Sequence, residues 1–412
     1  MAKKKIEQVE QGITAIEVEG YKSLYDRSRI EIRSLTLLAG ANSSGKSSII
    51  QPLLLLKQTL EAPYAPGALL LSGSNVRFTS SQQVFSRISP KTNKFTVKIY
   101  YGEQDCISLS FGKKPSQKAI EIIEALYQKE EKIIDLSPIK DFRFMYLEQM
   151  FFAQIRDPKN KIFPSQILDN NPSSLISFIR NLIHVPGVRG NPQRTYQTSA
   201  VDQVFPGTFE NYIASIIQNW QSKKDQRLSQ LSRNLYRLGL ANKIQANSIN
   251  EAEVELKVTR SIAGSKEMVS IADVGFGVSQ ILPVLVALLV AKPEQLVFIE
   301  QPEIHLHPRA QVALAEILTD AANRGVRVVI ETHSELLLLA VQSLVTENQI
   351  RPDRVRLHWF TRLENGASQI TSAELDQAGA FGDWPEDFGE VSLGLHDRYL
   401  SAAEAKLWAT ES

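Results

Sequence analysis

The sequence predicts an α/β fold: a mostly parallel sheet carrying a phosphate loop, an antiparallel β subdomain, and a largely helical insert that splits the sheet domain. Three observations support this prediction. The segment Gly40–Ser47 has the pattern G-x-x-x-x-G-K-S between an apolar strand and a helix start, residues 253–346 alternate between strand and helix, and residues 94–111 have the pattern of a β-hairpin. Alternation of strands and helices is typical of a parallel sheet with helices on its faces.

The composition is that of a globular chain without a membrane segment. Its 412 residues are sufficient for two or more structural units. The formal net charge of +1 gives no overall field toward nucleic acid or acidic membranes, so a DNA contact would need a local patch. Cys106 is the only cysteine, which excludes an internal disulfide and indicates a cytoplasmic protein. The longest apolar run, Ile281–Ala291, is 11 residues and too short to span a bilayer.

The phosphate loop follows the expected strand at residues 35–38, after strands expected at 13–18 and 29–32. Its glycines let successive N–H groups point inward, and the helix that opens after Lys46 adds its positive N-terminus. Lys46 is predicted to reach the β- and γ-phosphates of a nucleoside triphosphate, and the Ser47 hydroxyl to bind Mg²⁺. The alternative is a glycine-rich turn without a ligand. The candidate nucleotide-binding residues here are Gly40, Asn42, Ser43, Ser44, Gly45, Lys46, Ser47 and Ser48.

The organisation along the chain suggests one nucleotide-binding domain in two parts. The hairpin, with its turn at 102–105, closes the first part, and the pattern becomes helical from about residue 116. Strands are expected again at 252–258, 295–300 and 326–331, and helices at 281–291, 309–323 and 335–346. We therefore expect the first part of the domain in residues 1–115, the insert in 116–250, the second part in 251–350 and a C-terminal extension in 351–412.

Two polar residues follow the apolar strands of the second part. Glu300 ends one strand, where a carboxylate can hold Mg²⁺ together with Ser47. His333 follows the next strand, where it can hydrogen-bond a γ-phosphate oxygen or the attacking water. The alternatives are a solvated glutamate and a structural histidine.

A second glycine segment, Asp273–Gln280, precedes the apolar helix expected at 281–291. One triphosphate does not need two such segments, so two facing subunits could each cover the other's nucleotide. The alternative is a turn without a ligand. The candidate residues in this segment are Gly277, Ser279 and Gln280.

These motifs, in this order, resemble ABC-type ATPases of the SMC/RecF/OLD branch. The resemblance lies in the stretches Ile16–Leu24, Ile299–Pro308 and Glu331–Ser334, with weaker similarity at Val188–Tyr196 and Gly379–Phe388. The chain is similar to stand-alone prokaryotic AAA-type ATPases of anti-phage defence and DNA repair. This resemblance implies ATP and Mg²⁺ as ligands, a homodimer or higher oligomer formed through the ATPase heads, and a separately encoded effector such as a nuclease or toxin. It also implies that Ser279 acts on the partner's γ-phosphate and that His333 is the switch histidine.

The sequence departs from this family pattern at Gln301, where ABC enzymes usually have the glutamate that polarises water. An amide can orient water but cannot accept its proton. Either Glu303 acts as the base, or hydrolysis is slow and the protein is a long-lived ATP switch. The alternatives to a regulatory ATPase are an ATP-dependent nuclease of the OLD type and a non-hydrolysing, nucleotide-gated scaffold.

The remaining features indicate structure more than chemistry. His305 and His307 lack zinc-ligand spacing and are expected to shape a loop toward a dimer partner. The basic run from Lys223 to Arg237 is interpreted as a solvated helix face, although it could contact DNA or a protein. Arg189 and Arg194 are better candidates for a specific contact, with an unknown ligand.

Overall fold

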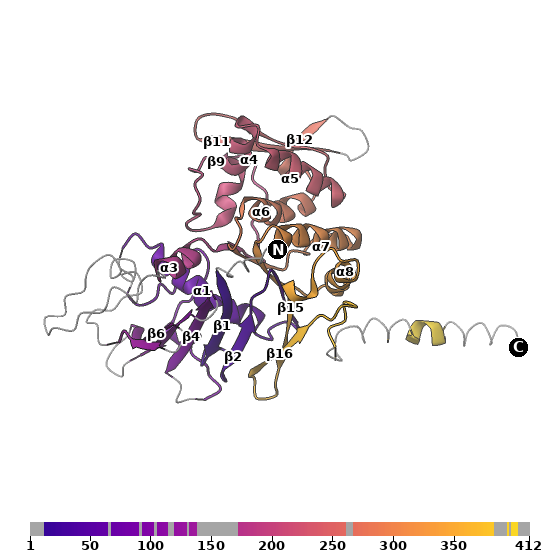
Figure 1. Cartoon of the computed structure of the whole chain (residues 1–412). Helices are drawn as coiled ribbons and strands as arrows, with labels where there is room; N and C mark the ends of the chain where they lie inside the picture. The colour runs from indigo at the N-terminus through magenta and orange to yellow at the C-terminus, as the bar shows by residue number, and fades with distance from the viewer. Residues whose placement is uncertain are drawn as a thin grey trace, which may run out of the picture.

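The computed structural model describes residues 12–64, 67–89, 93–102, 105–113, 119–129, 132–137, 172–260, 267–382, 394 and 397–402. Positions 103–104 of the predicted hairpin turn, residues 383–388 of the quoted C-terminal stretch and residues 1–11 lie outside this part. Within it, an antiparallel β lobe, a central layer and a smaller mixed lobe follow one another (Figure 1).

The central sheet is six-stranded, in the order β16-β15-β3-β14-β13-β8. All neighbouring pairs are parallel except β15 and β16. Strand β3 from the start of the chain lies between β14 and β15 from its second half, so the two halves form one sheet. The predicted parallel sheet is confirmed. Its strands are β3 (Leu35–Gly40), β8 (Ile183–Val185), β13 (Leu296–Glu300), β14 (Arg327–Glu331), β15 (Val355–Arg362) and β16 (Ser368–Glu374).

The second sheet is antiparallel and six-stranded, in the order β2-β1-β4-β5-β6-β7. It confirms the antiparallel subdomain and the hairpin of β4 and β5. The prediction of helical structure from residue 116 is wrong for 121–129 and 132–135, because these residues extend this sheet by two strands. The strands are β1 (Ile13–Glu19), β2 (Ser28–Glu31), β4 (Lys94–Tyr101), β5 (Asp105–Gly112), β6 (Glu121–Lys129) and β7 (Lys132–Asp135).

The third sheet is small and forms the mixed lobe with two helices (Figure 1). The expected strand at 252–258 is its central strand β11, and Glu255 and Lys257 on it pair at 3.1 Å. The strands are β9 (Tyr196–Gln197), β10 (Ile244–Ser248), β11 (Glu253–Thr259) and β12 (Met268–Ser270), and the helices are α4 (Ile213–Ser222) and α5 (Gln226–Arg237).

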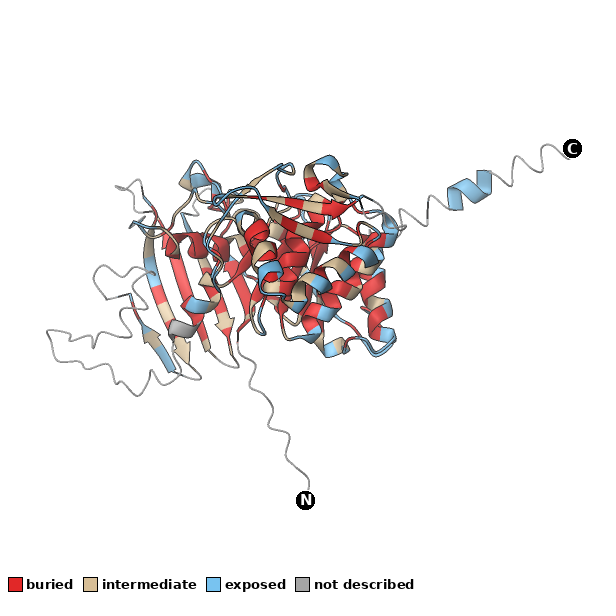
Figure 2. Cartoon of the chain, turned by 90° about the horizontal axis from the view of Figure 1, so that it is seen from above, coloured by how far each residue is buried: buried red, intermediate tan, exposed pale blue. Residues whose placement is uncertain are grey.

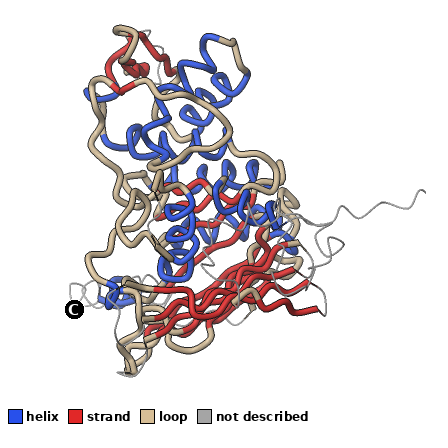
Figure 3. Tube along the Cα trace, turned by 90° about the vertical axis from the view of Figure 1, so that its left-hand side faces the viewer, coloured by secondary structure: helices blue, strands red, loops and turns tan. Residues whose placement is uncertain are grey.

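The other helices cover the two faces of the central sheet (Figure 3). Helix α1 packs between the central and antiparallel sheets, in a core that also takes in Leu38 and Phe298. Helices α6, α7 and α8 cover the opposite face in a second core. Figure 2 shows in red that most of the strands, and parts of the helices beside them, are buried. These helices are α1 (Lys46–Leu60), α3 (Pro172–Arg180), α6 (Phe276–Val290), α7 (Pro308–Asn323) and α8 (Glu335–Thr346).

Two helix starts explain how the chain turns back toward the sheet. The Ser334 side chain accepts a hydrogen bond from Leu337 N and caps α8, and His307 caps α7 ahead of Pro308. Helix α6 begins at Phe276, earlier than the predicted Ile281, so the glycine segment contributes its first turn. None of the helices in the described part of the chain has the length and apolar character of a membrane span.

Candidate functional site

The phosphate loop connects β3 to α1 and has a backbone that requires glycine at both ends. Gly40 has φ 136° and Gly45 has φ 104°, a region that L side chains rarely adopt. A Cβ at Gly40 would lie 2.2 Å from the Phe360 carbonyl oxygen, and one at Gly45 would lie 2.3 Å from Ser368 Oγ. The loop therefore fits closely against the β15–β16 hairpin, and the motif's glycines are sterically fixed.

The C-terminal hairpin also holds the loop by hydrogen bonds. Arg362 Nη1 donates to the Ser43 carbonyl at 2.9 Å, and Ser368 Oγ donates to the Ser44 carbonyl. Ser368 Oγ also bonds Ser23 Oγ at 2.8 Å. Sequence reasoning missed Arg362 and Ser368, because nothing in their local pattern indicates a contact with a loop more than 300 residues earlier. Arg362 and Ser43 are 319 residues apart in the sequence.

Lys46 and Ser47 already have partners inside the chain. Lys46 Nζ donates to the carbonyls of Gly40 at 3.0 Å and Ala41 at 2.7 Å, and burial lowers its pKa. Ser47 Oγ donates to Glu331 Oε2 at 2.6 Å. The carboxylate in contact with the loop serine is thus Glu331, at the end of β14, and burial raises its pKa. Glu331 begins the motif Glu331–Ser334, but the sequence predicted no role for it.

Glu300, at the end of β13, has partners in another segment. His184 Nε2 lies 3.1 Å from its Oε1, and Gly187 N donates to its Oε2 at 3.0 Å. Burial raises the pKa of this carboxyl, but His184, Gly187 and the charge of Arg189 outweigh burial and leave the pKa lowered. We call residues 184–190, which begin within β8 and supply these groups, the strap. Its contacts keep Glu300 charged.

Glu303 and His333 lie together beyond the carboxyl ends of β13 and β14. Glu303 Oε1 accepts hydrogen bonds from Thr332 Oγ1 and His333 N, both at 2.8 Å. Its other oxygen, Oε2, is buried and has no hydrogen-bond partner among the residues that the structure describes. Burial raises the pKa of Glu303. Burial and the charge of Lys46 lower the pKa of His333, which also interacts with the Gly40 backbone, so His333 adjoins the phosphate loop.

Gln301 lies between these carboxylates in an unusual conformation. Its φ is 44°, a left-handed value that costs a non-glycine residue roughly 1–3 kcal/mol. Its N–H donates to the Glu331 carbonyl at 2.7 Å. The chain between β13 and α7 therefore turns sharply at the position that departs from the family pattern.

The candidate residues of the second glycine segment lie apart from the phosphate loop, at the start of α6. Ser279 is partly exposed and its hydroxyl donates to the Phe276 carbonyl at 3.1 Å. Gln280 is buried, and its amide donates to the Gly190 carbonyl at 3.2 Å. Gly277 packs near Leu240. None of the three lines the pocket beside the phosphate loop, so within one chain this turn does not meet the loop.

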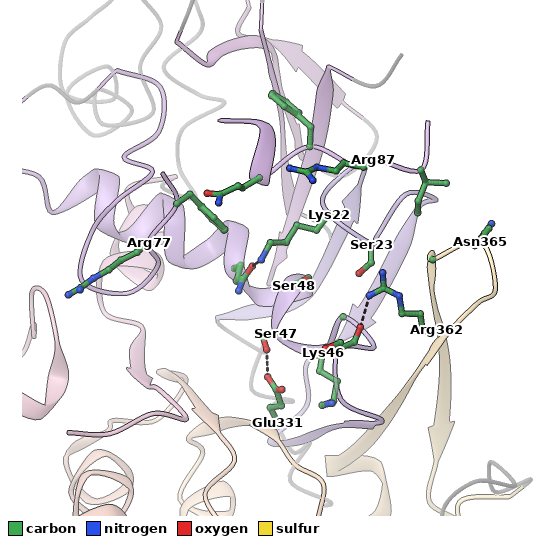
Figure 4. A pocket seen from close by; sticks show the side chains of 18 residues that line it. Lys22, Ser23, Lys46, Ser47, Ser48, Arg77, Arg87, Glu331, Arg362 and Asn365 are labelled. Carbon is green, nitrogen blue, oxygen red and sulfur yellow. Dashed lines mark hydrogen bonds between the residues drawn. The ribbon is translucent and has the colours of Figure 1, made fainter. Parts of the chain in front are cut away.

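The phosphate loop opens into a pocket of ≈ 790 Å³. The loop, the start of α1 and Glu331 form its floor, and the antiparallel lobe and the β15–β16 hairpin form its walls (Figure 4). Lys22 Nζ, in this wall, donates to Gln51 Oε1 at 2.7 Å. Five basic residues line the pocket and give it the charge that a polyanion requires: Lys22, Lys46, Arg77, Arg87 and Arg362.

The other residues considered have structural partners. His305 has φ 65° and its ring lies 5.8 Å from that of Phe276. On the basic helix α5, Arg237 pairs with Glu316 and Asp320 on α7. Arg194 pairs with Asp273 at 2.8 Å on the surface.

The loop, the carboxylates at neighbouring strand ends and the strand-end histidine define a P-loop ATPase fold of the ABC type. The chain belongs to the family described as "AAA domain, putative AbiEii toxin, Type IV TA system", whose family model matches residues 35–340. The predicted resemblance to ABC-type, SMC-like ATPases is confirmed, and membership implies nucleotide and Mg²⁺ use in general. No curated protein matches the chain.

Solved structures of SMC heads are similar to the chain. One, an SMC head bound to the C-winged helix domain of ScpA, is 16% identical with a TM-score of 0.52, covering 89% of this chain and 99% of that one. The SMC head domain from Thermotoga maritima is 13% identical, with a TM-score of 0.43 over 88% and 100%. The head from Pyrococcus furiosus, bound to a ScpA domain, is 13% identical, with a TM-score of 0.49 over 88% and 96%. The first likeness shows that the fold is that of an SMC head.

Proposed function

We propose that this chain is an ATP-binding, slowly hydrolysing ATPase whose heads dimerise around two ATP molecules. The convergence of Ser47, Glu331, Glu303 and His333 around Lys46 carries the proposal. In this scheme Lys46 leaves the loop carbonyls for the β- and γ-phosphates, and the loop N–H groups with the α1 N-terminus bind the same oxygens. The basic pocket walls receive the rest of the nucleotide.

The donor set fits Mg²⁺ next to a bound triphosphate. Mg²⁺ prefers oxygen ligands and is usually bound by one or two carboxylates together with substrate phosphates. Ser47 and Glu331 supply a hydroxyl and a carboxylate in contact, and Glu300 lies close enough to raise the pKa of Glu331 by its charge. Among the described residues no group of three His, Cys, Asp or Glu could hold a metal alone, which agrees with a site that the phosphates complete. When bound, Mg²⁺ neutralises charge on the phosphates.

Glu303 is the proposed base for the attacking water. Its free, buried Oε2 and its raised pKa suit a group that accepts a proton, because a general base works best when its pKa lies near the operating pH. His333 is held beside it and is proposed to bond the γ-phosphate. Gln301 orients water without accepting a proton, so turnover is expected to be slow.

The separation of Ser279 from the loop of its own chain supports the proposed dimerisation. We propose that Ser279 and Gly277 complete the ATP site of a second copy. Exposed Phe276, at the start of α6, would lie in the same interface. The head-like fold supports this arrangement, as does the partial exposure of Ser279.

The dimer is proposed to act as a regulatory or sensor subunit for a separately encoded effector in anti-phage defence or DNA transactions. The family description names a putative toxin system, and an SMC head of the same fold was solved bound to a ScpA domain. The partner of this chain is proposed by that analogy of fold.

The test combines a fluorescent ATP analogue with a mass measurement. We expect the wild type to bind MANT-ATP with Mg²⁺ and its mass in solution to double from 46.1 kDa when ATP is present. Lys46→Ala should weaken binding by about 100-fold, since a lost charge-assisted contact costs about 3 kcal/mol and each 1.4 kcal/mol is tenfold. Lys46→Ala that binds and dimerises as the wild type does would refute the proposal.

A second candidate, a non-hydrolysing nucleotide-gated scaffold, is favoured by Gln301 alone. It predicts ATP-dependent doubling of the mass without phosphate release over hours. Gln301→Glu separates the two functions, because restoring the carboxylate should speed release in a slow ATPase whose other groups are in place.

A further inference from the structure

Arg189 is a buried cation whose contacts connect two motifs of the site. It is 7% exposed. Its Nη1 donates to the Gln280 carbonyl at 3.2 Å, and its Nη2 donates to the carbonyls of Glu300 at 2.7 Å and Gln301 at 3.4 Å. One guanidinium thus bridges the first turn of α6 and the end of β13.

The burial of Arg189 indicates a specific positioning task. Burial lowers its pKa, and the charges of Glu210, Glu303 and Glu300 counter this effect. Its hydrogen bonds nevertheless go to main-chain carbonyls, and its Nε is buried without a partner among the described residues. A guanidinium has donors in a fixed planar fork, so it can hold several carbonyls at set relative positions, which a lysine cannot.

The rest of the strap completes this bridge. Gln280 answers Arg189 by donating its side-chain amide to the Gly190 carbonyl at 3.2 Å. At the other end, Gly187 N and His184 hold the side-chain carboxylate of Glu300. Arg189 holds the main-chain carbonyl of the same residue. The two peptide groups that flank Gln301 are therefore both held by hydrogen bonds. The left-handed φ of Gln301 lies between them.

Arg194, five positions further along the chain, provides a contrast. Its side chain is 73% exposed and pairs with Asp273 on the surface at 2.8 Å. In the sequence the two arginines are equal candidates for a specific contact. The structure separates them, because only Arg189 reaches the site.

We infer that Arg189 is a positioning residue that couples the first turn of α6 to the backbone of Glu300 and Gln301. The inference rests on the proposed function, in which Ser279, adjacent to Gln280, engages the ATP of a second copy. A shift of α6 on dimer closure moves the Gln280 carbonyl, and Arg189 passes this shift to the residues that place the water. ATP contact in one site is thereby linked to water placement in the other site, which belongs to the same chain.

Arg189→Met tests this coupling, because it keeps most of the buried stem and removes every donor. Arg194→Met is the matched control, with the same substitution at the exposed arginine. We expect Arg189→Met to bind MANT-ATP with an affinity within about threefold of the wild type, because the substitution removes no contact to the phosphate loop. Threefold corresponds to about 0.7 kcal/mol of binding free energy. Phosphate release and ATP-dependent dimerisation should fall by about 10- to 100-fold, the usual effect of losing a residue that orients a ligand-binding group. Arg194→Met should match the wild type in all three.

Four outcomes are informative. Arg189→Met with normal binding, turnover and dimerisation overturns the inference. Loss of MANT-ATP binding by a folded Arg189→Met overturns it as well, because that result indicates a general structural role. If Arg189→Met does not fold, Arg189→Lys and Gln280→Leu decide: a reduced turnover at unchanged ATP binding supports the coupling, and wild-type turnover in both refutes it. A wild type that shows no ATP-dependent dimer contradicts the proposed function itself, before any variant is measured.

Discussion

The phosphate loop and the end of β13 are parts of one site, yet their charged groups are held in different ways. At the loop, Lys46 bonds carbonyls of its own loop, and Ser47 bonds Glu331. At β13, Glu300 is held by a histidine, a backbone N–H and, through its carbonyl, Arg189. A phosphate or a cation can replace the first set of contacts, whereas nothing in the ligand replaces the second.

The ionisation of the carboxylates follows this difference. Burial raises the pKa values of Glu331 and Glu303, while the strap leaves that of Glu300 lowered. A carboxylate whose charge is poorly compensated gains most when a cation or a proton arrives. Glu331 and Glu303 are therefore prepared for exchange with the ligand, and Glu300 is fixed in place beforehand.

The substitution Glu303→Gln tests whether the Glu303 carboxylate accepts the proton of the attacking water. Glu303→Gln keeps the hydrogen-bonding shape and removes the ability to take a proton, so phosphate release should fall by about 1000-fold, within the range for general-base removal. Binding of MANT-ATP should be retained. Steady turnover equal to that of the wild type would remove Glu303 from the mechanism.

The next effect tests the loop as a steric fit. Gly45→Ala forces a side chain into φ 104° and brings Cβ within 2.3 Å of Ser368 Oγ and 2.9 Å of Ser23 Oγ. We expect MANT-ATP affinity to fall by about 100-fold, because strain of this kind costs about 1–3 kcal/mol and the loop must shift. Gly190→Ala is the control, since no atom lies within 4 Å of its added Cβ. Equal affinity of the two variants would contradict the fit.

A smaller effect concerns His358, which is fully buried and joins the two large sheets. Its Nε2 bonds the Glu31 backbone at 2.8 Å, and burial lowers its pKa to about 4. The unfolded chain, with a histidine pKa of about 6.5, takes up a proton first, so the stabilisation is complete above pH 6.5 and is lost as the pH falls toward 4. Urea unfolding at pH 7.5 and pH 5 should differ by about 2 kcal/mol from this group. His358→Gln should flatten that difference, and an unchanged slope would contradict the assignment.

The sequence predicted the parts of the site that have a local pattern. The loop, α7, α8 and the strands ending at Glu300 and Glu331 lie where the loop motif and the apolar runs indicated, and the parallel sheet followed from their alternation. Strands β6 and β7 were missed because their side chains are mostly half-buried or exposed, so their alternation is weak. The domain boundaries, and the roles of Gly277, Ser279 and Gln280 at a partner's nucleotide, stay predictions.

The contacts that support the site, including the partners of Arg189, could not be predicted for a different reason. Arg189, Arg362 and Ser368 act on main-chain carbonyls, and a carbonyl leaves no trace in the side-chain pattern of its segment. The partner of Ser47 was expected to be Glu300. The structure gives the hydroxyl to Glu331 because β14, not β13, is the strand beside β3.

Mixing two inactive variants tests whether each ATP site is completed by a second copy. Lys46→Ala lacks its own ATP grip but keeps Ser279, and Ser279→Arg keeps the loop but obstructs the partner's site. The account predicts that each variant alone releases no phosphate above background, and that their mixture regains activity as heterodimers with one intact composite site. Activity of Ser279→Arg alone, or no recovery when the mixture forms ATP-dependent heterodimers, would contradict it.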